Sequence, residues 1–556
     1  IMTDTDTIFF KNNKIYKEVP IGTPLSEVFR LVGSPLPYPP MNAQVNNLTE
    51  SLTCGCWKPQ DVEFVDYTQR SGMRTYVRSL CHILSKAVND LWPNAELHLE
   101  HPISKGYYCL VKGEQPLDET KISQLKEHMQ KLIDADLPFV PHLVQTAEAV
   151  ALFKEKGMDD KVRLIESAGM AYTPYYELDG YANFFYGCLT PSTGSIHLFD
   201  LVPYKRGMLL RVPRQSDPSQ LEPIVQQDKM YEAYKEHLNL QEAIRLNYVG
   251  DLNIAIKQKQ AQDIILVSEA MQEKQIAHIA EEIAKGYERG VRIVLISGPS
   301  SSGKTTFCKR LQVQLTTNLL RPIGLSLDDY FLDRENTPRD EHGEYDFESL
   351  YTLDLPYLNH DLERLMAGEE IDLPTFDFAS GKRIFRGQKL KMEENSVLVM
   401  EGIHGLNPEL TSPINAACTY KIYVSALTTI SLDSHNWIPT TDNRLLRRII
   451  RDYRYRGYSA EQTILRWPSV RRGENKWIFP YQENADAMFN SAMIYELAAM
   501  RPYAEPILDE VQENSPAYAE AQRLLRFLHY FCSIPIEKLP KTSLLREFLG
   551  GGSFKY

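Results

Sequence analysis

Three things that this sequence lacks narrow the class of protein. Eight cysteines in 556 residues are too few for a disulfide framework, and the one close pair, Cys54 and Cys56, is weak evidence for zinc. No apolar run approaches the ~18–20 residues of a membrane span, and the first residues are too polar for a signal peptide, so we expect a cytoplasmic protein. The net charge of −12 provides no general attraction for nucleic acid.

The remaining composition, 43% hydrophobic and 24% charged, is that of an ordinary globular protein with several domains. We expect a multidomain fold that combines α+β and α/β parts. The pattern of strands, helices and charge divides the chain into an α+β unit, a helix followed by aromatic strands, a helical connector, a region of alternating strands and helices, and a helical tail. These are residues 1–66, 67–215, 216–285, 286–505 and 506–556.

The most informative stretch follows the apolar run from Val291 to Ile296 and fits the pattern G-x-x-x-x-G-K-[ST]. Glycines allow a tight turn whose backbone N–H groups surround phosphate oxygens, a lysine reaches the terminal phosphates and a threonine ligates Mg²⁺. The apolar spacing of Phe307, Leu311, Leu315 and Leu319 predicts a helix that points its N-terminus at the phosphates. The predicted nucleotide-binding residues here are Gly298, Pro299, Ser300, Ser301, Ser302, Gly303, Lys304, Thr305 and Thr306.

Two acidic residues end predicted strands of the same region. Asp328 follows the strand that ends at Leu327, and Glu401 ends the strand from Val397. In an open α/β sheet the carboxyl ends of the strands face the ligand crevice. Asp328 is therefore predicted to act as a general base or metal ligand, and Glu401 and Thr305 to hold Mg²⁺.

An arginine-rich helix is predicted from Asp442 to Asp452. Its spacing places Arg444, Arg447, Arg448 and Arg451 along one side. Guanidinium groups bind phosphate oxygens in pairs, so we expect this helix to close over ATP and stabilise the transferring group. Arg444 and Arg447 are expected in the transfer itself, and Arg448 and Arg451 in nucleotide binding.

These motifs together resemble the uridine kinase family, within the phosphoribulokinase/uridine kinase group. The resemblance covers about residues 290–500 and includes the segments 325–331, 343–348 and 373–378. It implies a P-loop kinase domain with a parallel sheet flanked by helices, ATP and Mg²⁺ as cofactors, and Asp328 as the catalytic aspartate. It places acceptor-binding residues at Asp329, Tyr330, Glu348, Phe376, Asp377 and Arg383.

The sequence departs from that family in the acceptor region. Phe376 stands where the family has a tyrosine, and Gly381 stands where the family has a histidine that recognises pyrimidines. The loss of a hydrogen-bonding side chain removes ~1–3 kcal/mol of discrimination. Phosphoryl transfer is therefore expected, but the identity of the base stays open.

The N-terminal half resembles two other modules. Residues 22–28 and 43–52 look like a TGS domain, a β-grasp module, and residues 76–91 with 106–108 and 187–194 resemble the second domain of threonyl-tRNA synthetases. In those synthetases an H-x-x-x-H and a C-x-x-x-H pattern form a metal or editing site. Here only His82 and Cys188 of that set are present, so we expect no working editing site.

The function that this sequence predicts is ATP- and Mg²⁺-dependent phosphorylation of a small acceptor, with the 5′-hydroxyl of a nucleoside favoured. Two alternatives remain at this point: a sugar or sugar-phosphate kinase, and a nucleotide-switched protein that binds RNA or a small ligand. The expected partners are ATP, the acceptor and a second copy of the chain, while the negative charge speaks against nucleic acid and nothing indicates a membrane.

Overall fold

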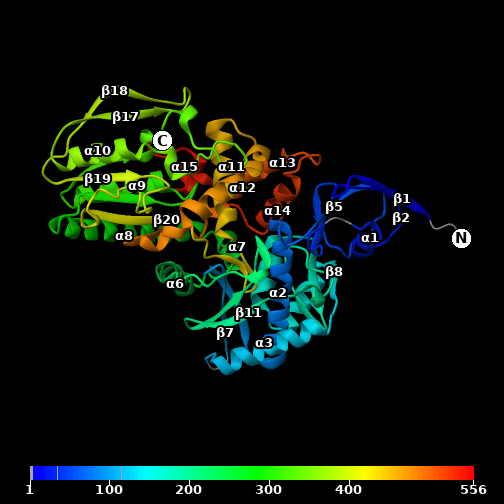
Figure 1. Cartoon of the computed structure of the whole chain (residues 1–556). Coiled ribbons are helices and arrows are strands. Elements are labelled where there is room, and N and C mark those ends of the chain that lie inside the picture. Colours follow the sequence, from blue (N-terminus) through cyan, green and yellow to red (C-terminus); the bar gives the residue numbers. More distant parts are fainter. Residues whose placement is uncertain (1–3, 34–35, 114–115) are drawn as a thin grey trace.

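The computed structural model describes residues 4–33, 36–113 and 116–556, and its parts are arranged as in Figure 1. The N-terminal unit is a mixed sheet with strand order β2-β1-β5-β3-β4, in which only the β1–β5 pair is parallel. Alternate apolar residues of β1 and β5 pack against α1 and form its core. Its elements are β1 (Thr5–Phe10), β2 (Ile15–Pro20), α1 (Leu25–Val32), β3 (Asn42–Val45), β4 (Leu48–Glu50) and β5 (Gln60–Val65).

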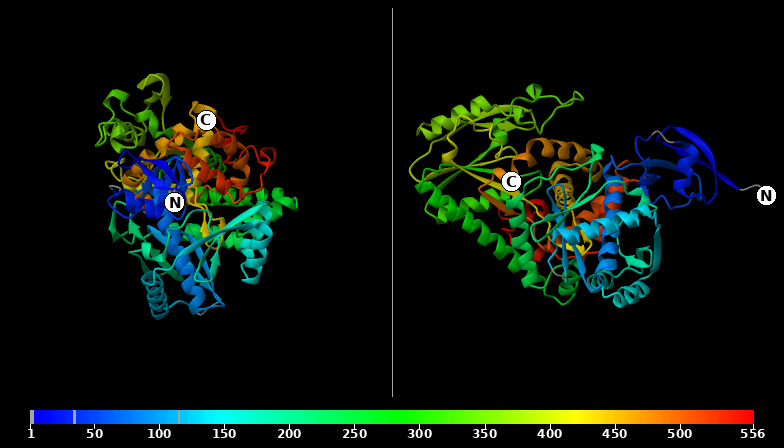
Figure 2. Two further views of the ribbon diagram at one scale, coloured as in Figure 1. Left: turned by 90° about the vertical axis from the view of Figure 1, so that its right-hand side faces the viewer. Right: turned by 60° about the horizontal axis from the view of Figure 1, so that its bottom comes forward.

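The second region is built on a long buried helix, α2, which carries two antiparallel sheets with strand orders β10-β9-β8 and β11-β12-β7-β6. Its helices are α2 (Arg70–Leu91), α3 (Glu119–Asp134), α4 (Thr146–Glu155) and α5 (Asp159–Ala168). Its strands are β6 (Glu96–Ile103), β7 (Gly106–Lys112), β8 (Phe139–Gln145), β9 (Tyr172–Leu178), β10 (Tyr181–Asn183), β11 (Asp200–Tyr204), β12 (Gly207–Arg211), β13 (Pro213–Arg214) and β14 (Asp217–Leu221). The right-hand view of Figure 2 shows the N-terminal unit projecting from one end of the molecule.

The third region is a five-stranded parallel sheet with strand order β16-β19-β15-β20-β23. Its strands are β15 (Ile293–Ser297), β16 (Arg321–Ser326), β19 (Ser396–Glu401), β20 (Thr419–Ser425) and β23 (Ala487–Asn490), and an antiparallel hairpin of β17 (Ile371–Asp377) and β18 (Lys382–Leu390) stands beside it. A second, short hairpin joins β21 (Ser431–Asp433) and β22 (Asn436–Trp437). The main helices are α6 (Asp228–Ala243), α7 (Val249–Lys257), α8 (Ala261–Glu288), α9 (Lys304–Thr317), α10 (Leu355–Met366), α11 (Thr440–Arg456), α12 (Ala460–Trp477), α13 (Glu496–Asp509), α14 (Tyr518–Leu528) and α15 (Arg546–Leu549).

Helices cover both faces of this sheet because its strands are apolar on both sides. Val294 and Ile296 of β15 point toward α8 and α9, whereas Ile293 and Leu295 point toward α10. A completely buried β15 places the carboxyl end of the central strand, and the loop after it, at the crevice edge. The expected parallel sheet is confirmed, and β15, β16 and β19 correspond to the strands predicted before the phosphate loop, before Asp328 and up to Glu401.

The predicted helix after the phosphate loop exists, but it is shorter than its apolar spacing suggested. Phe307, Leu311 and Leu315 are buried as expected, while α9 ends at Thr317 and Leu319 is 84% exposed. Leu319 has a positive φ of 65° because the chain reverses there, and Leu320 is buried in its place. The assignment of Leu319 to the packed face of this helix was therefore wrong.

The second and third regions interlock at the β21–β22 hairpin. Lys161 of α5 and Asp433 form an ion pair at 3.0 Å in which neither side chain is exposed. Asn436 donates to the carbonyl of Phe184. Helix α8 crosses residue 285 and α13 crosses residue 505, so two of the expected borders fall inside continuous helices.

The C-terminal segment returns to the parallel sheet. Leu544 and Phe548 are fully buried in the cluster that α8, α9 and the sheet share. Among the residues that the structure describes, none of the helices combines the length and the apolar content that a bilayer crossing requires.

Candidate functional site

The loop between β15 and α9 has the backbone geometry that its glycines require. Gly303 has a φ of 87°, in the region that favours glycine, and directly precedes the first residue of α9. A Cβ on Gly298 would lie 2.0 Å from the carbonyl oxygen of Val424 in the neighbouring strand. Both positions therefore need glycine, and the loop N–H groups and the N-terminus of α9 lie at one edge of the sheet.

Lys304 and Thr305 meet the acidic residue at the end of β19. Lys304 Nζ donates to the carbonyls of Gly298 and Pro299 at 3.0 and 3.2 Å, and burial lowers its pKa. Thr305 Oγ1 donates to Glu401 Oε1 at 3.4 Å. Burial, with added repulsion from Asp328 and Glu547, raises the pKa of Glu401 to about 7. A carboxylate beside a threonine hydroxyl supplies the oxygen ligands that suit a hard divalent cation such as Mg²⁺.

Asp328 lies just after β16, in a short 3₁₀ turn. Burial raises the pKa of its carboxyl to about 6, while Lys304 opposes that rise. A carboxylate with such a pKa can accept a proton near neutral pH. The predicted base and the predicted phosphate-binding lysine are therefore electrostatic neighbours.

A cavity of about 360 Å³ opens in front of these groups. Of the residues that the sequence predicted, Ser300, Ser301, Lys304, Asp328, Glu348, Phe376, Arg448 and Arg451 line it. Sequence reasoning missed other lining residues, notably Phe331, Arg334, Phe347, Phe378, Arg456 and Arg466. Phe331, Phe376 and Phe378 pack edge to face, with ring centroids 5.2–6.4 Å apart and interplanar angles of 77–87°. The lining of the cavity thus combines aromatic side chains with charged ones.

The four predicted arginines of α11 separate into two pairs, although all were expected to face the nucleotide. Arg444 and Arg447 are fully buried behind the loop, where they form ion pairs with Glu474 and Glu496, each at 2.6 Å. They reach only the backbone of the loop, at the carbonyls of Ser300 and Ser301.

Arg448 and Arg451 line the cavity, together with Arg456 at the end of the same helix. Arg448 Nη1 donates to Ser300 Oγ at 2.8 Å, and both arginines pair with Asp452. The two pairs differ because α11 packs one side against α12 and α13 and leaves the next side over the cavity.

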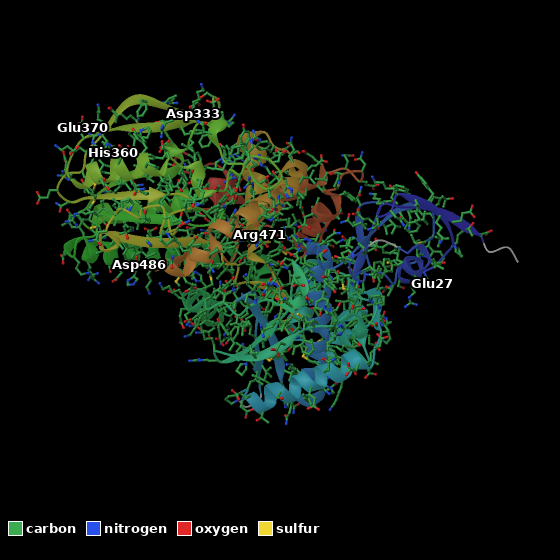
Figure 3. All side chains as sticks on the ribbon, viewed as in Figure 1. Glu27, Asp333, His360, Glu370, Arg471 and Asp486 are labelled. Atoms are coloured by element: carbon green, nitrogen blue, oxygen red, sulfur yellow. The ribbon has the colours of Figure 1, made fainter. Side chains whose placement is uncertain are left out.

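The remaining predicted acceptor residues support the β17–β18 hairpin rather than line the cavity. Tyr330 is buried and donates to Asp361 at 2.9 Å, and Asp329 accepts the N–H of Phe376 at 3.2 Å. Arg383 pairs with Asp354 at 3.0 Å and stacks on Tyr357. Asp377 accepts the N–H of Ser380 and thereby caps the turn of the hairpin. Figure 3 labels Asp333, whose carboxylate receives the N–H of Arg383.

Gly381 lies in the turn of that hairpin with a φ of 70°. A Cβ there would lie 2.9 Å from the side chain of Arg334, whose guanidinium donates to the carbonyl of Phe378 at 2.6 Å. The absence of a side chain at 381 therefore makes room for Arg334, which lines the cavity.

Thr306 has a partner from the C-terminal segment. Its N–H and its hydroxyl donate to Glu547 Oε2 at 3.3 and 2.6 Å, and its hydroxyl is 2.9 Å from that of Tyr556. The carboxylate of Glu547 therefore lies at the first turn of α9, where phosphate was expected. No signal in the sequence connects two segments so far apart.

His82 and Cys188 lie in different surroundings. His82 is buried among Phe139, Tyr181 and Phe185, and burial lowers the pKa of its imidazole to about 3. Cys188 lies beside Thr75, with its sulfur 3.4 Å from the threonine hydroxyl, and lines a second cavity. No cluster of three His, Cys, Asp or Glu side chains able to hold a metal occurs in the described ranges.

Comparison with known proteins separates the two halves of the chain. Residues 293–497 match the family described as "Phosphoribulokinase / Uridine kinase family". The N-terminal region resembles segments of threonine–tRNA ligases: that of Hahella chejuensis is 32% identical over 145 residues, which are 26% of this chain and 23% of the ligase. That of Syntrophomonas wolfei is 28% identical over 248 residues, 42% of this chain and 39% of the ligase. The chain thus spans well under half of these curated relatives.

Solved structures with some likeness include a possible uridine kinase from Bacillus stearothermophilus, at 18% identity and a TM-score of 0.26, covering 38% of this chain and 97% of the other. A D-glycerate 3-kinase from Cryptococcus neoformans var. grubii, at 14% identity and a TM-score of 0.20, covers 49% of this chain and 87% of the other. TM-scores this low carry no conclusion about activity.

Proposed function

We propose, from the premise that residues 293–497 form a domain of the phosphoribulokinase/uridine kinase family, that the chain transfers the γ-phosphoryl group of ATP to a hydroxyl of a small acceptor. The observation that carries this proposal is the convergence of Lys304, Asp328, Arg448 and Arg451 on one cavity beside the phosphate loop. Phosphoryl transfer depends on positioning and on stabilisation of charge, and these residue types supply both.

Asp328 is the proposed general base. It accepts the proton of the acceptor hydroxyl while that oxygen bonds to the γ-phosphorus and the bond from the γ-phosphorus to the bridging oxygen of ADP breaks. Lys304 and the N–H groups of the loop hold the β- and γ-phosphates, and Arg448 and Arg451 stabilise the charge of the transferring group. Arg444 and Arg447 are assigned a positioning role, since they hold the backbone of the loop from behind.

Thr305 and Glu401 are the residues that would hold Mg²⁺, and Asp328 is close enough to act on the charge of Glu401. When bound, the ion neutralises phosphate charge. The proposal for Glu401 rests on its place at the end of β19, where Thr305 Oγ1 lies 3.4 Å from its carboxylate.

A nucleoside is the proposed acceptor, through its 5′-hydroxyl. Phe331, Phe376 and Phe378 offer ring faces and edges for a base, and Glu348 offers a carboxylate for ribose hydroxyls. Arg334 occupies the space beside Gly381 and is the proposed hydrogen-bonding group for the base. Asp329, Tyr330, Asp377 and Arg383 are proposed to hold this wall in place.

A phosphorylated sugar is a second candidate, favoured by one observation. The cavity is lined by Arg334, Arg456 and Arg466 in addition to the cations already assigned to ATP, against only two carboxylates, Asp328 and Glu348. Surplus arginines suit an acceptor that carries its own phosphate.

For the N-terminal half we propose the division expected from the sequence. The strand order β2-β1-β5-β3-β4 with one crossing helix is that of a β-grasp and supports a TGS-like unit over residues 1–66. The ligase-like segments favour a synthetase-like second domain over 67–215. The family match favours a kinase domain within 286–505. The connector over 216–285 and the tail over 506–556 complete the proposed division, with the two borders moved to the ends of α8 and α13, after Glu288 and Asp509.

The test is a panel of nucleosides, sugars and sugar phosphates, incubated with the full chain and Mg·ATP and read by product mass. We expect the product of one acceptor class to gain 80 Da from a transferred PO₃H group. The rate of its formation should be about 10³-fold lower in Lys304→Ala. Lys309→Ala, on the same helix but outside the cavity, is the matched control. Unchanged activity in Lys304→Ala would sink the kinase proposal. ATP-dependent RNA binding without any phosphorylated acceptor would favour a nucleotide switch.

A further inference from the structure

A second large cavity lies where three parts of the chain meet, and nothing in the proposed kinase reaction uses it. Its volume is about 690 Å³, within the range of small-molecule sites. Its wall comes from β4 and the loop after it, from α2 and residues 185–188, and from α14. We refer to it as the junction cavity.

The junction cavity contains a guanidinium without an acidic partner. Arg78 Nη1 donates to the carbonyl of Cys188 at 2.7 Å, and the group lies 6.0 Å from the ring of Tyr186. A Cβ on Gly187 would lie 2.3 Å from this guanidinium, so the glycine is what allows Arg78 to lie flat against the backbone. Within the described part of the chain, Arg78 forms no ion pair. Burial lowers its pKa, yet an arginine stays charged at neutral pH.

The other cations of the cavity wall differ from Arg78. Arg74 and Arg523 share the carboxylate of Glu520, at 2.8 and 2.6 Å, so their charge is largely compensated. Arg526 lies at the rim, is exposed, and has no acidic partner in the ranges that the structure describes. The lining therefore includes two guanidinium groups without an acidic partner in the described ranges, Arg78 and Arg526, while the carboxylate of Glu50 accepts a hydrogen bond from Cys54 Sγ.

Another part of the wall is apolar. Leu48, Met170 and Phe185 line it, and Leu143 at the mouth is 69% exposed. Large apolar side chains exposed at the edge of a cavity mark a surface that a ligand can cover. An occupant that satisfies both parts of the wall carries an anionic group and an apolar body.

We infer that the junction cavity is a binding site for a small organic anion, a phosphate ester or a carboxylate with an aromatic or aliphatic body. Arg78 receives the anionic group, and Leu48, Leu143 and Phe185 receive the body. The site is separate from the phosphate loop, but Arg523 of its wall also holds Asp442 of α11 through two bonds of 2.7 Å. The ion pair between Arg523 and Asp442 therefore links the wall of the junction cavity to α11, the helix that positions the phosphate loop.

Calorimetric titration of the full chain with phenyl phosphate, phenylacetate and neutral benzyl alcohol tests this inference. The nucleotide site is first saturated with Mg²⁺ and a non-hydrolysable ATP analogue, so that phosphate esters cannot report on it. We expect saturable binding of at least one anion, and which of the two binds identifies the headgroup. Benzyl alcohol should bind about 10-fold or more weakly, because it lacks the charge that Arg78 pairs with.

Variants locate the binding. Arg78→Gln should weaken the anion about 10- to 100-fold, the loss of one charged hydrogen-bonding group in a buried site. Arg526→Glu, at an exposed position, should weaken anion binding about 5-fold. Arg321→Gln, an exposed arginine on the far sheet, is the matched control and should bind like the wild type. No saturable binding of either anion, or wild-type affinity in both Arg78→Gln and Arg526→Glu, would overturn the inference. Neither result depends on kinase activity.

Discussion

Arg444 and Glu474 face each other through two parallel hydrogen bonds, at 2.6 and 2.9 Å, in a place where neither side chain is exposed. The same two side chains hold the peptide of Ser300 from both sides. Arg444 donates to its carbonyl at 3.0 Å, and Glu474 accepts its N–H at 3.1 Å. The start of the phosphate loop is thus fixed by a buried ion pair between α11 and α12.

Breaking that pair should destabilise the protein strongly. Glu474→Gln keeps the shape but leaves Arg444 buried without its counter-charge, which typically costs ~3–5 kcal/mol. We expect denaturant unfolding to report a loss of this size, and ATP affinity to fall with it. The double variant Arg444→Met/Glu474→Met should be more stable than the single variant. A single variant as stable as the wild type would show that the pair contributes little.

The rate of phosphoryl transfer should depend on pH through Asp328. Its pKa is raised to about 6 by burial, and a general base works only when deprotonated, so kcat/KM should rise with pH through about 6 and level off above it. Asp328→Asn should lower kcat by about 10²–10⁴-fold and leave ATP binding nearly unchanged. A flat profile between pH 5 and 8 in the wild type would contradict the assignment.

The stability of the metal-free protein should fall as pH rises, because of Glu401. Its pKa in the folded state is about 7 against 4.5 in the unfolded chain, so the folded state binds the proton more tightly. The stabilising effect is fully present below about 4.5 and is lost as pH rises through about 7, a change of roughly 3 kcal/mol. Urea unfolding at pH 5 and pH 8 in the presence of EDTA measures it. Glu401→Gln should reduce the difference between the free energies of unfolding at pH 5 and pH 8. If the wild type and the variant show the same difference, groups other than Glu401 cause it.

Removal of the charge of Glu547 should tighten ATP binding. Its carboxylate accepts the N–H and the hydroxyl of Thr306 at the first turn of α9, and it therefore competes with phosphate and repels it. We expect Glu547→Gln to bind ATP about 3- to 10-fold more tightly by calorimetry, from the loss of one nearby like charge. Glu537→Gln, which lies earlier in the same C-terminal segment, serves as the control. Weaker ATP binding in Glu547→Gln would mean that this carboxylate supports the nucleotide instead.

The sequence predicted the parts of this site that are local in the chain. The run from Val291 to Ile296 reads as a buried strand, and the loop after it carries its chemistry in eight consecutive residues. Asp328 and Glu401 could also be picked out, because Glu401 ends β19 and Asp328 follows β16 by two residues, at the same edge of a parallel sheet. Patterns of this kind need no knowledge of distant contacts.

The partners of the arginines could not be predicted in this way. Helical spacing places Arg444, Arg447 and Arg448 on neighbouring positions, but whether a neighbour is solvent, a carboxylate or a cavity depends on how α12 and α13 return. The place of Arg334 in the cavity could not be predicted either, because Arg334 and Gly381 are far apart in the sequence and meet only at the turn of the hairpin. Leu319 was wrongly assigned to the helix because apolar periodicity does not reveal that the chain reverses at this residue with a positive φ.

The packing of Leu544 and Phe548 bears on how much of the chain the kinase domain needs in order to fold. These two residues, together with four residues of α8, close the face of the sheet that carries α9, yet both segments lie outside the stretch that the family match outlines. A gene segment limited to residues 293–497 would encode the phosphate loop with one side of its core open. Any unit that folds around this phosphate loop therefore needs the flanking helices as well, so the packed unit is wider than the stretch that the family match covers.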